Sequence, residues 1–295
     1  MTWVPALALA QTPGRMLWAD TQPLGRSFSK DPAVIWFGGR YLLYYSRPGY
    51  SAMEGWSVGV AESRDLLAWT PVAVVGPERE YEKKGLAAPF ATVIDGRVHL
   101  FYQTYGNGKS DAICHAVSLD GLKFEKDAAT VFHPTGSWNA GRAIDAEVVK
   151  FKGRWLMYAA TRDPEMKVQM IVGAFRKKGW GEWEMLANRP LLKSELPWEQ
   201  DCIEAPATVV RGDWLYMFYA GAYNNAPQQI GCARSRDGVS WTRVSQERCC
   251  RWARRGSGTR RKAGTRGRSW ILERSRRICS TRGTRTRARR GCCRG

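Results

Sequence analysis

Apolar and polar positions alternate with the period of β-strands in four stretches of the chain, each interrupted by a two-residue turn. In AIDAEVVKFKGRWLMYAATRD, residues 143–163, Val148, Val149 and Phe151 precede Lys152-Gly153, and a run of aromatic and aliphatic residues follows. Alternation around a dipeptide that contains Gly is typical of a β-hairpin. The same arrangement surrounds Gly38-Gly39, Asp95-Gly96 and Arg211-Gly212. The pattern therefore predicts four β-hairpins.

The four hairpins repeat at a nearly constant spacing. The positions seven residues before each turn are Asp31, Ala88, Asp145 and Glu204. Asp31 to Ala88 and Ala88 to Asp145 are each 57 residues, and Asp145 to Glu204 is 59 residues. A second motif, AESRDLLAW, AVSLDGLKF and ARSRDGVSW, recurs out of phase and indicates an Asp-centred turn in three units. Such a period is typical of a β-propeller, in which four-stranded blades surround a channel.

Three of the four equivalent positions carry carboxylates, although Asp and Glu are unfavourable within strands. Exposure to solvent would explain any one of them. In a propeller, however, the innermost strand of each blade lines the channel, so we expect Asp31, Asp145 and Glu204 to converge. Crowding separates the pKa values of neighbouring carboxyl groups, and glycoside hydrolysis uses one carboxylic acid and one carboxylate. The three positions therefore form a candidate glycosidase site.

Three short motifs resemble the catalytic motifs of five-bladed β-propeller glycosidases, most closely those of glycoside hydrolase family 43. They are Lys30-Asp31-Pro32, Ile144-Asp145 and Ile203-Glu204-Ala205-Pro206, within a resemblance that covers about residues 17–247. The resemblance implies an inverting enzyme in which Asp31 is the general base, Glu204 is the general acid, and Asp145 tunes the pKa of the acid. The related families 32 and 68 retain configuration. Their Arg-Asp-Pro signature occurs here as Arg162-Asp163-Pro164, after the outgoing strand, and we interpret it as a loop turn.

The resemblance implies an all-β fold, a five-bladed propeller of which four blades are recognisable and the fifth is lost or irregular. We assign the propeller domain to residues 11–247. The resemblance implies that no cofactor is required, although a structural calcium ion on the propeller axis is possible. We assign no metal-binding residues and expect a monomer. Candidate substrate-binding residues near the channel positions are Phe90, Gln103, Trp138, Arg142 and Tyr223.

Two other functions remain open. A glycoside phosphorylase of similar fold would need a phosphate site beside the acid, for which Arg142 and Arg162 are candidates. A non-catalytic carbohydrate-binding propeller is less consistent with three carboxylates in one register, because burying them is costly. The expected substrate is a plant- or microbe-derived oligosaccharide or polysaccharide. The sequence does not select among arabinofuranosides, xylosides, galactosides and fructosides.

Nearly all of the net charge of +19 lies in residues 248–295, which contain seventeen Arg and one Lys but one Glu. A basic arm for nucleic acid or anionic membranes is the usual interpretation of such a segment. However, residues 256–266 can be read in another frame as EWNAKESGHP, and the shifted text restores a fifth hairpin with a His codon at position 265. We therefore interpret this tail as a frameshift product that begins near Glu247-Arg248 and is disordered, and we expect no nucleic-acid partner.

The N-terminal sequence MTWVPALALAQTP resembles the end of a secretory signal. We interpret residues 1–10 as a truncated signal remnant and expect a secreted or periplasmic protein. No apolar segment is long enough to span a membrane, so we expect no membrane association. Cys114, Cys202 and Cys232 lack metal-ligand spacing and are expected to be small buried side chains.

The tail gives a prediction about the chain as written. Residues 248–295 lack strand periodicity, so ordering them would cost more conformational entropy than their burial recovers. We expect the chain as written to have poor solubility and little glycosidase turnover, and a chain with the reading frame restored near codon 247 to recover both. Side-by-side measurement of protease resistance and turnover tests this. Equal stability and activity of the two chains would contradict the frameshift and require another role for the tail.

Overall fold

The computed structural model describes residues 18–22, 25, 28, 30–49, 55–223 and 228–249. These residues form sixteen β-strands in four antiparallel sheets, and two short 3-10 helices, Glu80–Glu82 and Gly108–Ser110. No helix of this part of the chain is long and apolar enough to cross a membrane. The proposed signal remnant and the segment where a fifth blade was expected lie outside the described residues.

Each sheet is one propeller blade whose four strands follow one another in sequence order. Blade 1 contains β1 (Lys30–Phe37), β2 (Arg40–Arg47), β3 (Ser57–Ser63) and β4 (Thr70–Val75). Blade 2 contains β5 (Leu86–Ile94), β6 (Arg97–Thr104), β7 (Ile113–Ser118) and β8 (Glu125–Lys126). Blade 3 contains β9 (Ile144–Phe151), β10 (Arg154–Arg162), β11 (Gln169–Lys178) and β12 (Glu182–Met185). Blade 4 contains β13 (Ile203–Arg211), β14 (Trp214–Gly221), β15 (Gln229–Ser235) and β16 (Thr242–Arg243).

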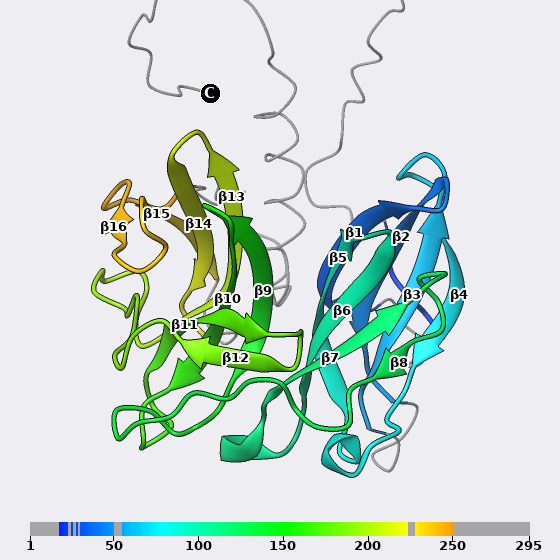
Figure 1. Cartoon of the computed structure of the whole chain (residues 1–295), viewed down its shortest axis with the longest axis horizontal. Helices are drawn as coiled ribbons and strands as arrows, with labels where there is room; N and C mark the ends of the chain where they lie inside the picture. The colour runs from blue at the N-terminus through cyan, green and yellow to red at the C-terminus, as the bar shows by residue number, and fades with distance from the viewer. Residues whose placement is uncertain are drawn as a thin grey trace, which may run out of the picture.

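The innermost strands bring the four blades together around a common centre. β1 contacts β5, β5 contacts β9, and β9 contacts β13. In Figure 1, blades 1 and 2 lie on one side of this centre and blades 3 and 4 on the other. The predicted all-β propeller with four recognisable blades is confirmed.

Two-residue turns join the first two strands of every blade. In blades 1 to 3 the predicted turns are correct, and both residues of each turn have positive φ, the pattern of a type I′ turn. In blade 4 the prediction was wrong by one residue. Arg211 still belongs to β13 and pairs with Trp214, so the turn is Gly212-Asp213, and only Gly212 has positive φ, at 56°. A type II′ turn needs Gly at its first central position, which explains the shift.

Apolar side chains fill the space between successive blades. One buried cluster joins blades 1 and 2, a second joins blades 2 and 3, and a third joins blades 3 and 4. Buried tyrosines add polar links across two of these boundaries, because Tyr44 donates a hydrogen bond to Gly121 O and Tyr158 donates one to Gly238 O, each at 2.8 Å. Gly121 and Gly238 belong to the predicted Asp-centred turns, so this second repeat joins neighbouring blades.

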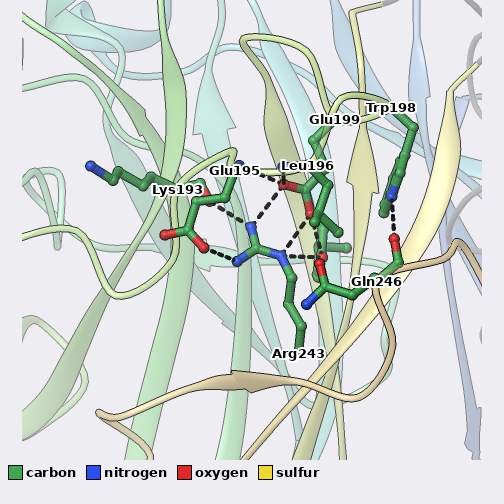
Figure 2. A network of polar contacts seen from close by, with 8 residues as sticks. Lys193, Glu195, Leu196, Trp198, Glu199, Arg243 and Gln246 are labelled. Atoms are coloured by element: carbon green, nitrogen blue, oxygen red, sulfur yellow. Dashed lines mark hydrogen bonds and ion pairs between the residues drawn. The ribbon is translucent and has the colours of Figure 1, made fainter.

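A buried acid links three parts of blade 4 (Figure 2). Glu199, in the loop before β13, is fully buried and accepts hydrogen bonds from Tyr219 on β14 at 2.6 Å and from Arg243 on β16 at 2.9 Å. Its other oxygen accepts bonds from the backbone N–H groups of Glu195 and Leu196. Burial raises the pKa of Glu199, but these bonds outweigh it and hold the pKa below its usual value.

The same network occurs in two other blades. In blade 2, Glu82 is fully buried, accepts a hydrogen bond from Tyr102 at 2.6 Å, and pairs with Lys126 at 2.9 Å. In blade 1, Asp20 accepts a bond from Tyr45 at 2.8 Å and lies 3.4 Å from Arg47 Nε. A tyrosine, an acid and a cation therefore fix the chain that enters each of these blades. Such an acid is costly to bury unless it is paired and hydrogen-bonded, as it is here.

Two buried histidines and a partly exposed aspartate form a chain of polar side chains between blades 2 and 3. His115 Nδ1 lies 3.1 Å from Asp127 Oδ2, and His115 Nε2 lies 3.0 Å from His99 Nδ1. Because the Asp127 carboxylate accepts, His115 carries its proton on Nδ1, and His99 then donates from its own Nδ1. Burial, with a smaller contribution from the charge of His115, lowers the pKa of His99 from 6.5 to about 4.

The His99 environment predicts an acid-sensitive stability. The pKa of His99 is lower in the folded state than in the unfolded state, so stability is fully present above pH 6.5 and falls as the pH decreases toward 4. We expect the free energy of unfolding to fall by about 3 kcal/mol over this window, and by less in His99→Gln. Urea denaturation at several pH values measures it. His133→Gln, at an exposed position, is the control and should follow the wild type. Parallel pH profiles for His99→Gln and the wild type would contradict this assignment.

Candidate functional site

A β-bulge interrupts each innermost strand near its start. Two residues of the inner strand oppose one residue of its neighbour, and the first of the two adopts a left-handed conformation, which is unusual outside Gly. The four bulge pairs and their φ values at the first residue are Asp31-Pro32 at 52°, Ala88-Pro89 at 47°, Asp145-Ala146 at 55° and Ala205-Pro206 at 50°.

The bulges correct the register that was predicted for Glu204. Asp31, Ala88 and Asp145 occupy the same bulge position as predicted, but the equivalent residue in blade 4 is Ala205. Glu204 stands one residue earlier and pairs with Ala220, as Lys30 pairs with Ser46. The error follows from the fourth turn, which lies one residue later than the sequence indicated. Glu204 is therefore the structural equivalent of Lys30.

Despite this offset, the structure brings the three carboxylates into one site. The Lys30 ammonium lies 3.8 Å from Asp31 Oδ2. The charge of Asp31 raises the pKa of Lys30, burial opposes this rise, and the charges of Asp145 and Glu204 add to it. Acids from β1, β9 and β13 therefore act on a single cation, as the convergence of these strands requires.

The candidate base Asp31 is held by a serine from the neighbouring strand. Ser46 on β2 donates a hydrogen bond to Asp31 Oδ2 at 2.7 Å. The same hydroxyl oxygen accepts a bond from the backbone N–H of Ala88 at 2.7 Å, and Ala88 is the bulge residue of the next blade. Ser46 thus fixes the carboxylate of blade 1 and the backbone of blade 2 together.

Gln103 performs the corresponding task one blade later. It lies on β6 at the register position of Ser46, is buried, and accepts a hydrogen bond from the backbone N–H of Asp145 at 2.8 Å. The prediction gave Gln103 a contact with substrate hydroxyl groups. The carbonyl oxygen of Gln103 is occupied in holding the Asp145 backbone, and the substrate contact stays a prediction.

The candidate acid Glu204 is enclosed by two carboxamides. Gln169 at the start of β11 donates to Glu204 Oε2, and Gln228 donates to Glu204 Oε1. Burial raises the pKa of Glu204 to about 7, the charge of Asp145 adds to the rise, and the charge of Lys30 and the bond from Gln228 oppose it. A carboxyl group with this pKa exchanges its proton near neutral pH, as a general acid must.

Arg162 orients one of these carboxamides. Its Nε donates to Gln169 Oε1 at 2.8 Å, which turns the Gln169 amide nitrogen toward Glu204. Asp163 accepts hydrogen bonds from the backbone N–H groups of Lys167 and Val168, at 2.6 and 2.9 Å, and closes a short loop. The Arg-Asp-Pro sequence is therefore a loop turn, as predicted, and its Asp163 forms no part of the carboxylate group.

Tyr223, a predicted substrate-binding residue, contacts Arg162 and Lys167. The Arg162 guanidinium lies 5.6 Å from the centre of its ring, and its hydroxyl donates to Lys167 O. Burial raises the pKa of Tyr223, and the charge of Glu204 is among the smaller contributions in the same direction. The ring is half-buried, and its contact with substrate stays a prediction.

The other predicted binding residues have different neighbours. Phe90 is half-buried and packs against the apolar cluster between blades 2 and 3. Trp138 packs against the same cluster and donates from Nε1 to Asn188 at 3.0 Å. Arg142 lies 3.4 Å from Asp111 Oδ2. None of the contacts described for these three side chains reaches a carboxylate of the site.

Several site residues were missed by the sequence reasoning. Lys30 and Ser46 are direct neighbours of Asp31, and Gln169 and Gln228 bind Glu204. Alignment of the blades on Pro32, Pro89 and Pro206 would have shown that Lys30 and Glu204 occupy equivalent positions. It would have shown the same for Ser46 and Gln103. Gln169 and Gln228 carry no repeat signal.

The site can be compared with the requirements of a metal centre. Within the described ranges, no group of three or more His, Cys, Asp or Glu side chains is arranged to hold a metal ion. Cys114, Cys202 and Cys232 are free and buried, as predicted. The calcium ion on the axis stays a prediction.

The surroundings of Glu204 predict how its titration responds to substitution. Removing the like charge in Asp145→Asn should lower the pKa of Glu204 from about 7, by about one unit. Carbon-13 NMR of labelled Glu side chains measures this titration. Glu184→Gln, at a half-exposed position on β12, is the matched control and should leave it unchanged. An unaltered Glu204 titration in Asp145→Asn would contradict the coupling of the two carboxyl groups.

Comparison with known proteins identifies relatives among carbohydrate-active enzymes. The raffinose invertase of Escherichia coli is 27% identical over 197 residues, which cover 62% of this chain and 37% of the relative. The sucrose-6-phosphate hydrolase of Escherichia coli is 29% identical over 210 residues, which cover 66% and 42%. A 1,2-beta-oligomannan phosphorylase of Thermoanaerobacter sp. is 25% identical over 203 residues, which cover 65% and 64%. The chain thus spans well under two thirds of the length of the two hydrolases.

Solved structures share the fold. An endo-arabinase from Bacteroides thetaiotaomicron superimposes with a TM-score of 0.61 at 19% identity, over 78% of this chain and 84% of that one. A thermostable family-43 glycoside hydrolase superimposes with a TM-score of 0.58 at 21% identity, over 74% and 72%. The model of the family described as glycosyl hydrolases family 43 matches residues 21–248. With this match over most of its length, and with three acids converging from β1, β9 and β13, the chain belongs to glycosyl hydrolases family 43.

Proposed function

We propose that this protein is a glycoside hydrolase that cleaves O-glycosidic bonds of oligosaccharides or polysaccharides by an inverting acid/base mechanism. The observation that carries the proposal is the contrast between two acids of one site. Glu204 is enclosed and has a pKa raised to about 7, whereas Asp31 lies beside a cation and accepts a hydrogen bond from Ser46. Different environments of this kind separate a proton donor from a proton acceptor.

In the proposed reaction Glu204 protonates the leaving glycosidic oxygen. Burial and the charge of Asp145 keep its proton available near neutral pH. Gln169 and Gln228 donate to its two oxygens and so stabilise the carboxylate that remains after the proton has left. These opposing effects leave the pKa of Glu204 at about 7, so that the group can both hold and release a proton near neutral pH.

Asp31 is the proposed general base. Its carboxylate accepts the proton of a water molecule as that water attacks the anomeric carbon from the side opposite the leaving group. Ser46 and Lys30 contact Oδ2, and they fix the orientation of the carboxylate. Asp145, with its backbone held by Gln103, contributes charge that raises the pKa of Glu204.

A glycoside phosphorylase is the second candidate function. The similarity of this chain to the 1,2-beta-oligomannan phosphorylase favours it. Phosphate would need free cationic donors next to Asp31 or Glu204. Arg162 is engaged by Gln169 and Tyr223, and Arg142 is paired with Asp111, although Arg142 Nη1 is buried without a partner among the described residues. Turnover of a disaccharide with and without inorganic phosphate separates the two reactions. Product released in phosphate-free buffer supports hydrolysis, and an absolute requirement for phosphate supports the phosphorylase.

The assigned roles predict how two variants treat different leaving groups. Glu204→Gln should lose kcat/KM by about 100-fold or more on alkyl glycosides, which need protonation, and much less on nitrophenyl glycosides, which do not. Asp31→Asn should lose activity on both classes, because water activation is needed in every case. The measurement is kcat/KM on a panel of aryl and alkyl glycosides.

Glu165→Gln is the control, because Glu165 is exposed on the loop after β10. It should retain wild-type rates on both substrate classes. Equal losses on both classes from Glu204→Gln would remove Glu204 from the acid role. Proton NMR of the first product anomer tests inversion separately.

A further inference from the structure

In the proposed reaction Lys30 serves only as a contact of Asp31, but its charge also acts on Asp145 and Glu204. Lys30 directly precedes the bulge of β1, where the equivalent residues of β5 and β9 are Ala87 and Ile144, both buried and apolar. On β13 this position carries Glu204. Equivalent positions of β1 in blade 1 and β13 in blade 4 thus carry a cation and an acid.

Contacts on two sides hold the Lys30 ammonium in place. Its Nζ lies 3.8 Å from Asp31 Oδ2 and 5.8 Å from the centre of the Trp56 ring. The Trp56 ring is itself packed against Tyr105, with 5.1 Å between the ring centres. The Lys30 side chain is 28% exposed, so its charge is only partly screened by water.

The charged and titratable groups that face Lys30 come from four elements. Asp31 lies on the same strand, Asp145 on β9, Glu204 on β13, and Tyr105 directly after β6. All four favour the charged form of Lys30, and burial opposes it. Three carboxylates without this cation would repel one another, and each would hold its proton to a higher pH.

We propose that Lys30 is a positioning residue whose ammonium pairs with Asp31 and balances the negative charges of the three acids in the site. This inference rests on the proposed hydrolase function and adds to it a condition for the coexistence of an ionised base and a protonated acid. The acid and the base need different protonation states at the same pH. Asp145 favours the proton on Glu204 and Lys30 opposes it, so the two charges act in opposite directions on the acid of the site.

The kinetic test compares Lys30→Met with Lys30→Arg. In Lys30→Met the acidic limb of kcat/KM should move to higher pH by about one unit, because a group of three carboxylates without a cation binds protons more tightly. The alkaline limb should move in the same direction, because the charge of Lys30 also opposes the proton on Glu204. A tenfold loss at the acidic limb, with recovery in Lys30→Arg, is the expected result.

Lys83→Met is the matched control. Lys83 is a lysine with a 69% exposed side chain that pairs with Glu80 away from the site, and its removal should leave both limbs unchanged. Unmoved limbs in Lys30→Met, including the case in which only KM rises, would overturn the proposal. A rise of KM alone would mean that Lys30 binds substrate directly.

A second measurement does not depend on catalysis. The melting temperature of Lys30→Met should fall further below that of the wild type as the pH rises from about 4 to about 8, because the three carboxylates ionise over this range. A difference that stays constant with pH would overturn the proposal even for an inactive protein. If instead the melting data fit and no glycoside is cleaved, the charge balance stands and the proposed function fails.

Folding failure of Lys30→Met also has a defined outcome. The double variant Lys30→Met/Asp145→Asn removes one positive and one negative charge from the site. It should fold and should recover most of the lost melting temperature at pH 8. No recovery in the double variant would show that Lys30 acts through packing on Trp56 and would overturn the proposal.

Discussion

The bulge near the start of each innermost strand is the constraint on which the site depends. It inserts one extra residue, turns the backbone into a left-handed conformation, and leaves a backbone N–H outside the regular ladder. In blades 2 and 3 that N–H is bonded by Ser46 and Gln103, which belong to the preceding blade. The orientation of Asp145 is therefore set by the neighbouring blade as much as by its own strand.

Opposite each bulge stands a single residue of the second strand, and in three blades it is a buried tyrosine. Tyr45, Tyr102 and Tyr219 each donate to a buried acid, which also binds a cation of the same blade. The bulge, the tyrosine and the acid thus form one unit that joins the entry loop to the interior of the blade. Blade 3 has Ala159 at the tyrosine position, and this is the blade that supplies Asp145.

The sequence was informative where the information is local or repeated. Alternation and Gly turns identified the hairpin between the first two strands of every blade, and the regular spacing identified the blades and the convergence of Asp31, Asp145 and Glu204. The fourth turn was misplaced because its backbone differs from the other three, and the count from that turn then misaligned Glu204. Gln169 and Gln228 were not predictable, because they reach Glu204 from β11 and from the residue before β15, and neither position repeats. Trp138 and Arg142 are near Asp145 in the sequence, but their side chains pack against Asn188 and Asp111.

The direction of the contacts between blades has a consequence for synthesis on the ribosome. Ser46 is synthesised before its partner Ala88, and Gln103 before its partner Asp145. The carboxylate of Glu147 accepts bonds from the backbone and hydroxyl of Thr208, and Glu147 is synthesised before Thr208. Each strand that enters the centre therefore meets a partner that has already left the exit tunnel. The site can therefore be fixed in the order in which it is translated.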